Sequence, residues 1–425
     1  MKRNTILGAF GIALVVMLAG SGSPNNLFCF QSIAHASELN NNVLKMAKSP
    51  VDSIDERLKK VNNQLGFRLL THLFNSQQQQ NIFISPTSIA IALGMTYNGA
   101  SGTTQQAMAR ALGLEGLSLK DINLGYQKLQ TNLQQAEPDL QLSIANSLWA
   151  NREISFKHQF LKNNREFYQA QVTNLDFNNF QSKNIINSWV REATNQKIRQ
   201  IVDSINPDDV LFLINAVYFQ GNWHQQFEAN LTGEKPFYLS ANFAKPQPMM
   251  SQTGEYSYYE NEQFQAVSLP YEQKRLSMYI FLPKPDNDLA ALSQQLTNEN
   301  WEEWMKQFRR QEGSLQIPRF KLEYGVDLDR AIAALGMGII FDGDRASFEA
   351  MTSKPVAIDQ IKHKTFVEVN EEGTEAAGVT SVGVRVTSAM ETKPFEMVVD
   401  RPFFCAIKDE QTGTILFMGA IVDPT

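Results

Sequence analysis

The apolar residues between positions 54 and 73 recur every three or four residues, which predicts an amphipathic helix. Ser53 or Asp55 can cap its first turn. After the polar turn NSQQQQN, the run IFIS predicts a short strand, and PTSIAIALGMTYNGA predicts a buried helix that Gly99 ends. Thr103 or Thr104 can cap a further helix, QQAMARALG. Helical patterns therefore dominate up to about residue 135.

Strand-like runs dominate the rest of the chain, apart from a helical pattern in NIINSWVREATNQKI. They are rich in β-branched and aromatic residues and include LFLINAVYF, QAVSLPYE, LSMYIFLPK, KTFVEVNE, EMVVDRPFFCAIKD and ILFMGAIVDP. Helices cluster early and strands late, without strict alternation, which predicts an α+β fold with a mixed or antiparallel sheet. Because no repeat and no linker divides residues 50–425, we expect a single domain.

Residues 369–394 fit neither an ordinary strand nor an ordinary linker. From 373 to 393 they contain no proline and almost no large side chain, yet valine recurs among them. The even positions from 374 to 386 are small or aliphatic, whereas the charged residues Glu375 and Arg385 are at odd positions. This period of two predicts a strand with one buried face. The small residues at its start fit a strand that enters a sheet already formed.

The N-terminus has the pattern of a secretory signal. Lys2 and Arg3 precede the apolar run ILGAFGIALVVMLAG, and the small-residue site AHA precedes Ser37. We therefore expect residues 1–36 to be removed and residues 37–425 to be exported, to the periplasm or the extracellular space. A retained membrane anchor is the alternative, although the apolar run is short for a membrane span.

Removal of this signal changes the composition in two ways. Cys29 leaves with it, so Cys405 remains alone in a strand-like apolar run, where a buried, inert thiol is expected and no internal disulfide can form. Of the 38 basic residues 36 remain against 44 acidic ones, a formal charge of −8. This acidic balance disfavours nucleic acid, anionic lipid and heparin-like partners.

The sequence contains few of the motifs that form catalytic or metal-binding sites in enzymes. The mature chain keeps four histidines, His72, His158, His224 and His363, and has no G-x-S-x-G, H-E-x-x-H, C-x-x-C or G-x-G-x-x-G spacing. We interpret His224 as a surface or packing residue and His363 as a structural histidine of a strand. A catalytic Ser–His–Asp set assembled from distant residues remains the alternative. We expect no catalysis, no metal and no cofactor.

Five motifs, in order along residues 50–425, resemble the serpin family. They are NIFISPTSIAIALGMTYNGASGTTQQAM, INAVYFQGNW, VNEEGTEAAG, DRPFFCAI and LFMGAIVDP. The resemblance implies helices packed on a large mixed central sheet with smaller sheets, and an exposed reactive loop at about 371–393. It also implies a metastable, monomeric inhibitor: a protease cleaves the loop, becomes acylated, and is trapped when the loop inserts into the sheet.

The resemblance also assigns roles to single residues. The family's hinge corresponds to residues 371–378, which are Glu371, Glu372, Gly373, Thr374, Glu375, Ala376, Ala377 and Gly378. The shutter, a polar cluster beneath the opening of the sheet, corresponds to Ser85, Ser88, Asn215 and His363. The breach at the top of the sheet corresponds to Trp223 and to an ion pair of Arg319 with Glu371, although core packing explains Trp223 equally well.

Family spacing predicts that the protease cleaves between Thr387 and Ser388. A threonine flanked by valine suits an elastase-like or subtilisin-like serine protease. Arg385 is the alternative and would suit a trypsin-like protease. Gly378 and Gly383 add flexibility that can slow insertion, so the stoichiometry of inhibition stays open.

Two other functions are compatible with the sequence. A non-inhibitory serpin would act as a carrier, chaperone or storage protein, but such members usually have bulky, charged or proline residues on the buried face of the hinge, and residues 374–386 have none. An unrelated secreted hydrolase would instead turn over its substrate.

Overall fold

A computed structural model describes residues 50–77, 80–134, 140–374 and 393–424. Residues 50–425 form one compact unit. The expected signal at 1–36 lies outside the described residues, as do Glu375, Ala376, Ala377, Gly378, Arg385, Thr387 and Ser388 of the expected reactive loop. Within the described residues, no helix is long and apolar enough to cross a membrane.

The helices precede most of the strands in the sequence, as predicted. They are α2 (Pro50–Ser76), α3 (Pro86–Tyr97), α4 (Gly102–Ala111), α5 (Leu119–Gln134), α6 (His158–Tyr168), α7 (Gln181–Ala193), α8 (Leu289–Gln295), α9 (Asn298–Gln307) and α10 (Asp329–Ile332), with short turns η1 (Ala229–Leu231), η2 (Ala333–Met337) and η3 (Gly338–Phe341).

The described strands form two sheets. They are β1 (Ile82–Ile84), β2 (Gln141–Asn151), β3 (Gln171–Leu175), β4 (Leu211–Asn222), β5 (Gly233–Ser240), β6 (Phe243–Glu260), β7 (Phe264–Pro270), β8 (Leu276–Pro283), β9 (Arg309–Pro318), β10 (Phe320–Asp327), β11 (Gln360–Val369), β12 (Gly373–Thr374), β13 (Phe395–Val398), β14 (Phe403–Asp409) and β15 (Ile415–Ile421).

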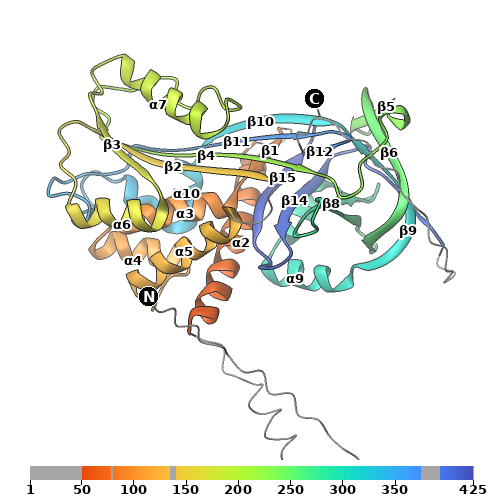
Figure 1. Cartoon of the computed structure of the whole chain (residues 1–425), viewed down its shortest axis with the longest axis horizontal. Coiled ribbons are helices and arrows are strands. Elements are labelled where there is room, and N and C mark those ends of the chain that lie inside the picture. Colours follow the sequence, from red (N-terminus) through yellow and green to blue (C-terminus); the bar gives the residue numbers. More distant parts are fainter. Residues whose placement is uncertain (1–49, 78–79, 135–139, 375–392, 425) are drawn as a thin grey trace, which may run out of the picture. The chain divides into compact units, whose positions relative to one another are not determined.

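The six-stranded sheet has the order β10-β11-β12-β4-β2-β3. In Figure 1, α7 lies on one of its faces, and α3, α5 and α6 lie on the other. The α3 helix is buried along its whole length because its small residues pack closely between this sheet and α2. On the opposite face, α7 and the chain after it cover a second apolar cluster that includes Trp149, Ile198 and Tyr218. The centre of this sheet is therefore packed on both faces.

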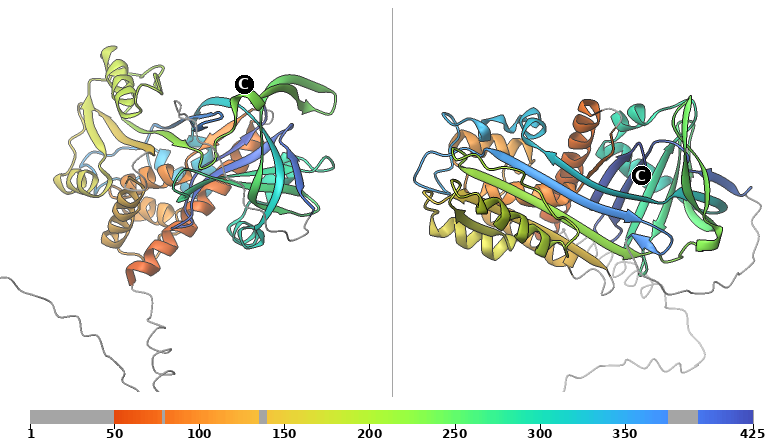
Figure 2. Two further views of the ribbon diagram at one scale, coloured as in Figure 1. Left: turned by 45° about the vertical axis from the view of Figure 1, so that its right-hand side comes forward. Right: turned by 90° about the horizontal axis from the view of Figure 1, so that it is seen from above.

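The nine-stranded sheet has the order β1-β15-β14-β8-β7-β6-β9-β13, and β5 pairs with β6. The right-hand view of Figure 2, from above, shows that the strands of this sheet run at an angle to those of the six-stranded sheet, near one end of that sheet. Most of its central positions, in β7, β8, β14 and β15, are fully buried. The prediction of an α+β fold with a large mixed sheet and a further sheet is confirmed.

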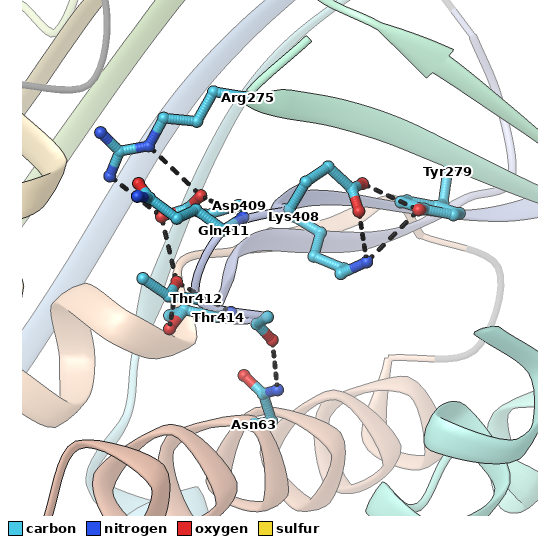
Figure 3. A network of polar contacts seen from close by, with 10 residues as sticks. Asn63, Arg275, Tyr279, Lys408, Asp409, Gln411, Thr412 and Thr414 are labelled. Carbon is cyan, nitrogen blue, oxygen red and sulfur yellow. Dashed lines mark hydrogen bonds and ion pairs between the residues drawn. The ribbon is translucent and has the colours of Figure 1, made fainter. Parts of the chain in front are cut away.

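A polar network fixes the turn between β14 and β15 (Figure 3). Asp409 is fully buried and accepts two hydrogen bonds from Arg275, at 3.3 and 3.2 Å, and one from Thr412 at 3.0 Å. Asn63 of α2 donates to the carbonyl of Gly413 and accepts from the amide of Ile415. The C-terminal hairpin is thus fastened to the first helix of the unit.

The predicted helix starts were wrong by a few residues. The α2 helix begins at Pro50, so neither Ser53 nor Asp55 is its cap, and α4 begins at Gly102 after Ser101. Thr104 lies inside α4, where its hydroxyl accepts a hydrogen bond from the amide of Ser347 at 2.9 Å. These threonine and serine side chains can cap a helix or bind a neighbouring loop, and the tertiary contact decides which.

Candidate functional site

The two residues of β12 lie between the ends of the central strands β4 and β11. Thr374 pairs with Val369 of β11 and with Gly221 of β4, in both cases antiparallel. Further along the sheet, β11 and β4 pair directly and in parallel, from Phe366 with Tyr218 to Gln360 with Phe212. The seam between β4 and β11 is therefore open at one end, where β12 lies between the two strands, and closed over the rest of its length.

Only glycine fits the first position of β12. A Cβ atom on Gly373 would lie 2.2 Å from the carbonyl oxygen of Gly221 and 2.6 Å from the Cα of Asn222. Both are backbone atoms of a strand held in a sheet, so they cannot move aside as a side chain can. This close approach explains a glycine at a place where strand propensity disfavours it.

The side chain of Thr374 is fully buried, as its even position predicted. Its hydroxyl forms a hydrogen bond of 2.7 Å with the hydroxyl of Tyr271. The ring of Tyr271 stacks on Trp223, with centroids 4.8 Å apart and planes at 18°. The indole of Trp223 donates to the carbonyl of Asn370 at 3.0 Å, and its amide donates to the carbonyl of Glu372 at 2.8 Å. Trp223 therefore both packs in the core and holds the turn that leads into β12.

Glu371 and Arg319 are brought together as the resemblance implied. The guanidinium Nε donates to both carboxylate oxygens at 2.7 Å, and Nη2 also contacts the carboxylate. Thr232, just before β5, donates its hydroxyl to the same carboxylate. The Glu371 side chain is 8% exposed and that of Arg319 is 44% exposed. Burial opposes ionisation of Glu371, but the bonds from Arg319 and Thr232 outweigh it and hold its pKa below the usual value.

The four predicted shutter residues also meet. His363 of β11 accepts a hydrogen bond at Nε2 from the amide of Ser85 at 3.1 Å, so the ring proton is on Nδ1, which donates to Asn215 Oδ1 of β4 at 2.5 Å. Asn215 donates in turn to the hydroxyl of Ser88 and to Asn146 Oδ1 at 2.6 Å. The His363–Asn215 bond crosses the closed part of the seam and ties it to the start of α3.

Burial lowers the pKa of His363 from 6.5 to about 3, while the contact with Asn215 acts in the opposite direction. The imidazole is therefore neutral at pH 7, as its acceptor role towards Ser85 requires. No sequence pattern pointed to Asn146, whose Nδ2 is buried without a partner among the described residues. Tyr271 and Thr232 were missed for the same reason: each is one polar residue in a strand or turn, without a periodic pattern.

Among the described residues, no group of His, Cys, Asp and Glu side chains could hold a metal ion. Cys405 is buried, and burial raises the pKa of its thiol to about 12, so it is a poor nucleophile. His224 is exposed, as expected for a surface residue.

Comparison with known proteins agrees with this geometry. A model of the family described as Serpin (serine protease inhibitor) matches residues 60–424. The chain belongs to the serpin family. The resemblance stated from the five motifs is thereby confirmed.

Several serpins can be aligned with most of this chain. Serpin B6 of Macaca fascicularis is 36% identical over 376 residues, which is 86% of this chain and 99% of the relative. The leukocyte elastase inhibitor of Bos taurus is 35% identical over 382 residues, 87% of this chain and 100% of the relative. The solved structure of human thyroxine-binding globulin in a complex has a TM-score of 0.81 at 25% identity, and the match covers 88% of this chain and 100% of that one.

We predict that Gly373→Ala displaces β12 from the sheet, because the new methyl group would overlap the backbone of β4. Hydrogen exchange of the segment from Asn370 to Thr374, and of the amide of Trp223, should become about tenfold faster or more. Gly343→Ala is the matched control, since a Cβ there meets no atom within 4 Å. Unchanged exchange in Gly373→Ala would show that the strand can accept a side chain.

We predict that the serpin loses stability as pH falls from about 6.5 towards 3, partly through His363. The unfolded state takes up a proton on this side chain below pH 6.5, whereas the folded state does so only near 3, so the free energy of unfolding falls with falling pH. The slope from this group is at most about 1.4 kcal/mol per pH unit. Denaturant unfolding at several pH values should show a shallower slope for His363→Gln than for wild type. Equal slopes for wild type and His363→Gln would contradict the assignment.

Proposed function

We propose that this serpin inhibits a serine protease as a suicide substrate, with the segment after Thr374 inserting between β4 and β11 once the protease has cleaved it. The observation that supports this most directly is the position of β12. Gly373 and Thr374 pair with β4, and Thr374 also pairs with β11, so the next residues along the chain need only continue that pairing.

The register of β12 gives this proposal a definite geometry. Because the pairing is antiparallel, each further residue of the loop would lie opposite a residue one position earlier in β4 and one position earlier in β11. Ala377 would then lie level with Tyr218 and Phe366, and Thr380 with Asn215 and His363. Insertion would separate His363 from Asn215, and the hydroxyl of Thr380 can replace the bond that is lost. Small even positions suit this path because their side chains would point towards the buried helices.

Simple energetics also favour insertion. A new central strand of about twelve residues gains hydrogen bonds on both edges, and at about 0.5–1.5 kcal/mol each the sum is on the order of 10 kcal/mol. A typical folding stability is about 5–15 kcal/mol. An uninserted loop is therefore a metastable state that a kinetic barrier maintains.

The reactive bond is proposed between Thr387 and Ser388, with Arg385 as the alternative site. Threonine beside valine suits an elastase-like or subtilisin-like protease, and one relative is named as an elastase inhibitor. Cleavage after Arg385 would instead suit a trypsin-like protease and would shorten the inserted strand by two residues. We propose that the inhibitor acts as a monomer without a heparin-like or other cofactor.

A non-inhibitory carrier is the second candidate, because thyroxine-binding globulin has the same fold. The two functions differ in what happens after cleavage of the loop. An inhibitor forms a covalent adduct with the protease, whereas a carrier is cleaved and releases an active protease.

We also propose that residues 1–36 direct export and are then removed, leaving Ser37 as the first residue. The basic start, the apolar run and the small-residue site support this. N-terminal sequencing of the protein recovered outside the cytoplasm should begin at Ser37 or close to it. Recovery of the intact N-terminus in a membrane fraction would favour the retained anchor.

We predict that Thr374→Arg converts the inhibitor into a substrate. Thr374 is fully buried against Tyr271, and burying an unpaired guanidinium there costs several kcal/mol, so insertion would slow and the acylated protease would hydrolyse its ester and leave. Glu375→Arg is the matched control, since its odd position places the same charge on the opposite face.

The measurement is the ratio of covalent adduct to cleaved inhibitor on denaturing gels, with elastase, subtilisin and trypsin. Wild type and Glu375→Arg should give mainly adduct, and Thr374→Arg mainly cleaved protein. If Thr374→Arg forms adduct as efficiently as Glu375→Arg, the assignment of the buried face is wrong. If wild type forms no adduct with any serine protease, the carrier is favoured.

A further inference from the structure

An aromatic pair marks the point where the closed part of the seam begins. Phe366 of β11 lies opposite Tyr218 of β4 in the last direct pair before β12, and their ring centroids are 6.3 Å apart. Both side chains are buried, on the face of the sheet that α7 covers. If the hinge advances beyond Thr374, this is the first side-chain pair on that face that must separate.

Lys197 lies over both rings of this pair. Its ammonium is 5.8 Å from the centroid of Phe366 and 6.0 Å from that of Tyr218, within the range of a cation–π interaction. The side chain is half-buried, and partial desolvation strengthens such contacts. One cation thus contacts two rings that belong to the two strands on either side of the seam.

The chain before and after Lys197 holds it in this place. Asn195 and Gln196 have left-handed backbone conformations, with φ of 50° and 66°, and turn the chain sharply after α7. Beyond Lys197, Asn187 accepts from the amides of Ile201 and Val202 at 2.9 and 3.0 Å. A left-handed glutamine is unfavourable, so the fold imposes this turn on the sequence.

We infer that Lys197 is a positioning residue that closes the seam: it bridges Tyr218 and Phe366 and so limits how fast the loop enters the sheet. Neighbouring strands are about 4.8 Å apart, so a strand inserted between β4 and β11 would roughly double the separation of the two rings. The ammonium can then keep one ring but not both. The contact stabilises the closed seam and is weakened in the inserted state. This inference rests on the proposed insertion mechanism.

Lys321 provides a matched control within the same cluster. Its ammonium is 5.4 Å from the centroid of Phe366, but Lys321 belongs to β10, which pairs with β11 on the side away from the seam. Insertion between β4 and β11 leaves this contact intact. Lys321 also forms an exposed ion pair with Glu368, at 3.0 Å, again on the β11 side of the seam.

The test compares Lys197→Met, Lys197→Arg and Lys321→Met in the full-length serpin. Lys197→Met keeps the apolar stem and removes the charge, so the intact protein should convert to its loop-inserted form on warming about three to ten times faster than wild type. Lys197→Arg retains a cation for the rings and should stay within about twofold of wild type, as should Lys321→Met. Conversion is followed on native gels and by resistance to denaturant.

A second measurement distinguishes this role from general stabilisation. After cleavage and insertion the ammonium can contact only one of the two rings, so cleaved Lys197→Met should lose less resistance to denaturant, relative to cleaved wild type, than intact Lys197→Met loses relative to intact wild type. The inference is overturned if Lys197→Met converts at the wild-type rate, if Lys321→Met accelerates conversion equally, or if Lys197→Met weakens the cleaved form as much as the intact form. Wild type that neither converts on warming nor gains stability on cleavage would instead overturn the insertion mechanism itself.

Discussion

Backbone hydrogen bonds between β4 and β11 hold the centre of the six-stranded sheet closed over only part of its length. A parallel pair inside a sheet is normally complete, because unpaired strand edges in the interior are unfavourable. Here β12 satisfies the edges where the two strands diverge, and Gly373 allows that fit. The contacts of Glu371, Trp223 and Tyr271 all depend on this arrangement, since they fix the turn that delivers β12 to the gap.

The type of side-chain interaction between β4 and β11 changes along the seam. At the open end an ion pair and a stacked pair of rings hold the turn, and at the closed end neutral His363 and Asn215 form a buried hydrogen bond. A buried neutral hydrogen bond can be exchanged for another one at small net change in free energy, whereas a buried charge cannot. The proposed insertion would therefore exchange the His363–Asn215 hydrogen bond for a new one at small net cost.

Much of this could be predicted from the sequence, and the exceptions have physical causes. Runs such as LFLINAVYF are apolar on both faces, so β4 was evident, and period two identified the buried side of Thr374. The strand β2 was missed because Asn146 and its polar neighbours interrupt any apolar pattern. Thr232 and Lys197 were missed because turns without periodicity bring them to their partners. The pairing of Arg319 with Glu371 followed from the family resemblance alone.

The C-terminal hairpin has a consequence for how the chain is made. Strands β14 and β15 lie in the interior of the nine-stranded sheet, and β15 pairs with β1, more than 300 residues earlier in the chain. The side-chain amide of Asn63 in α2 also cannot form its hydrogen bond to the carbonyl of Gly413 until that residue has been made. During synthesis α2 and β1 therefore have no complete surface to fold against until β14 and β15 have left the ribosome. Completion of the fold is a late, long-range event, and a chain that lacked β15 would leave the edges of β1 and β14 unpaired and prone to aggregation.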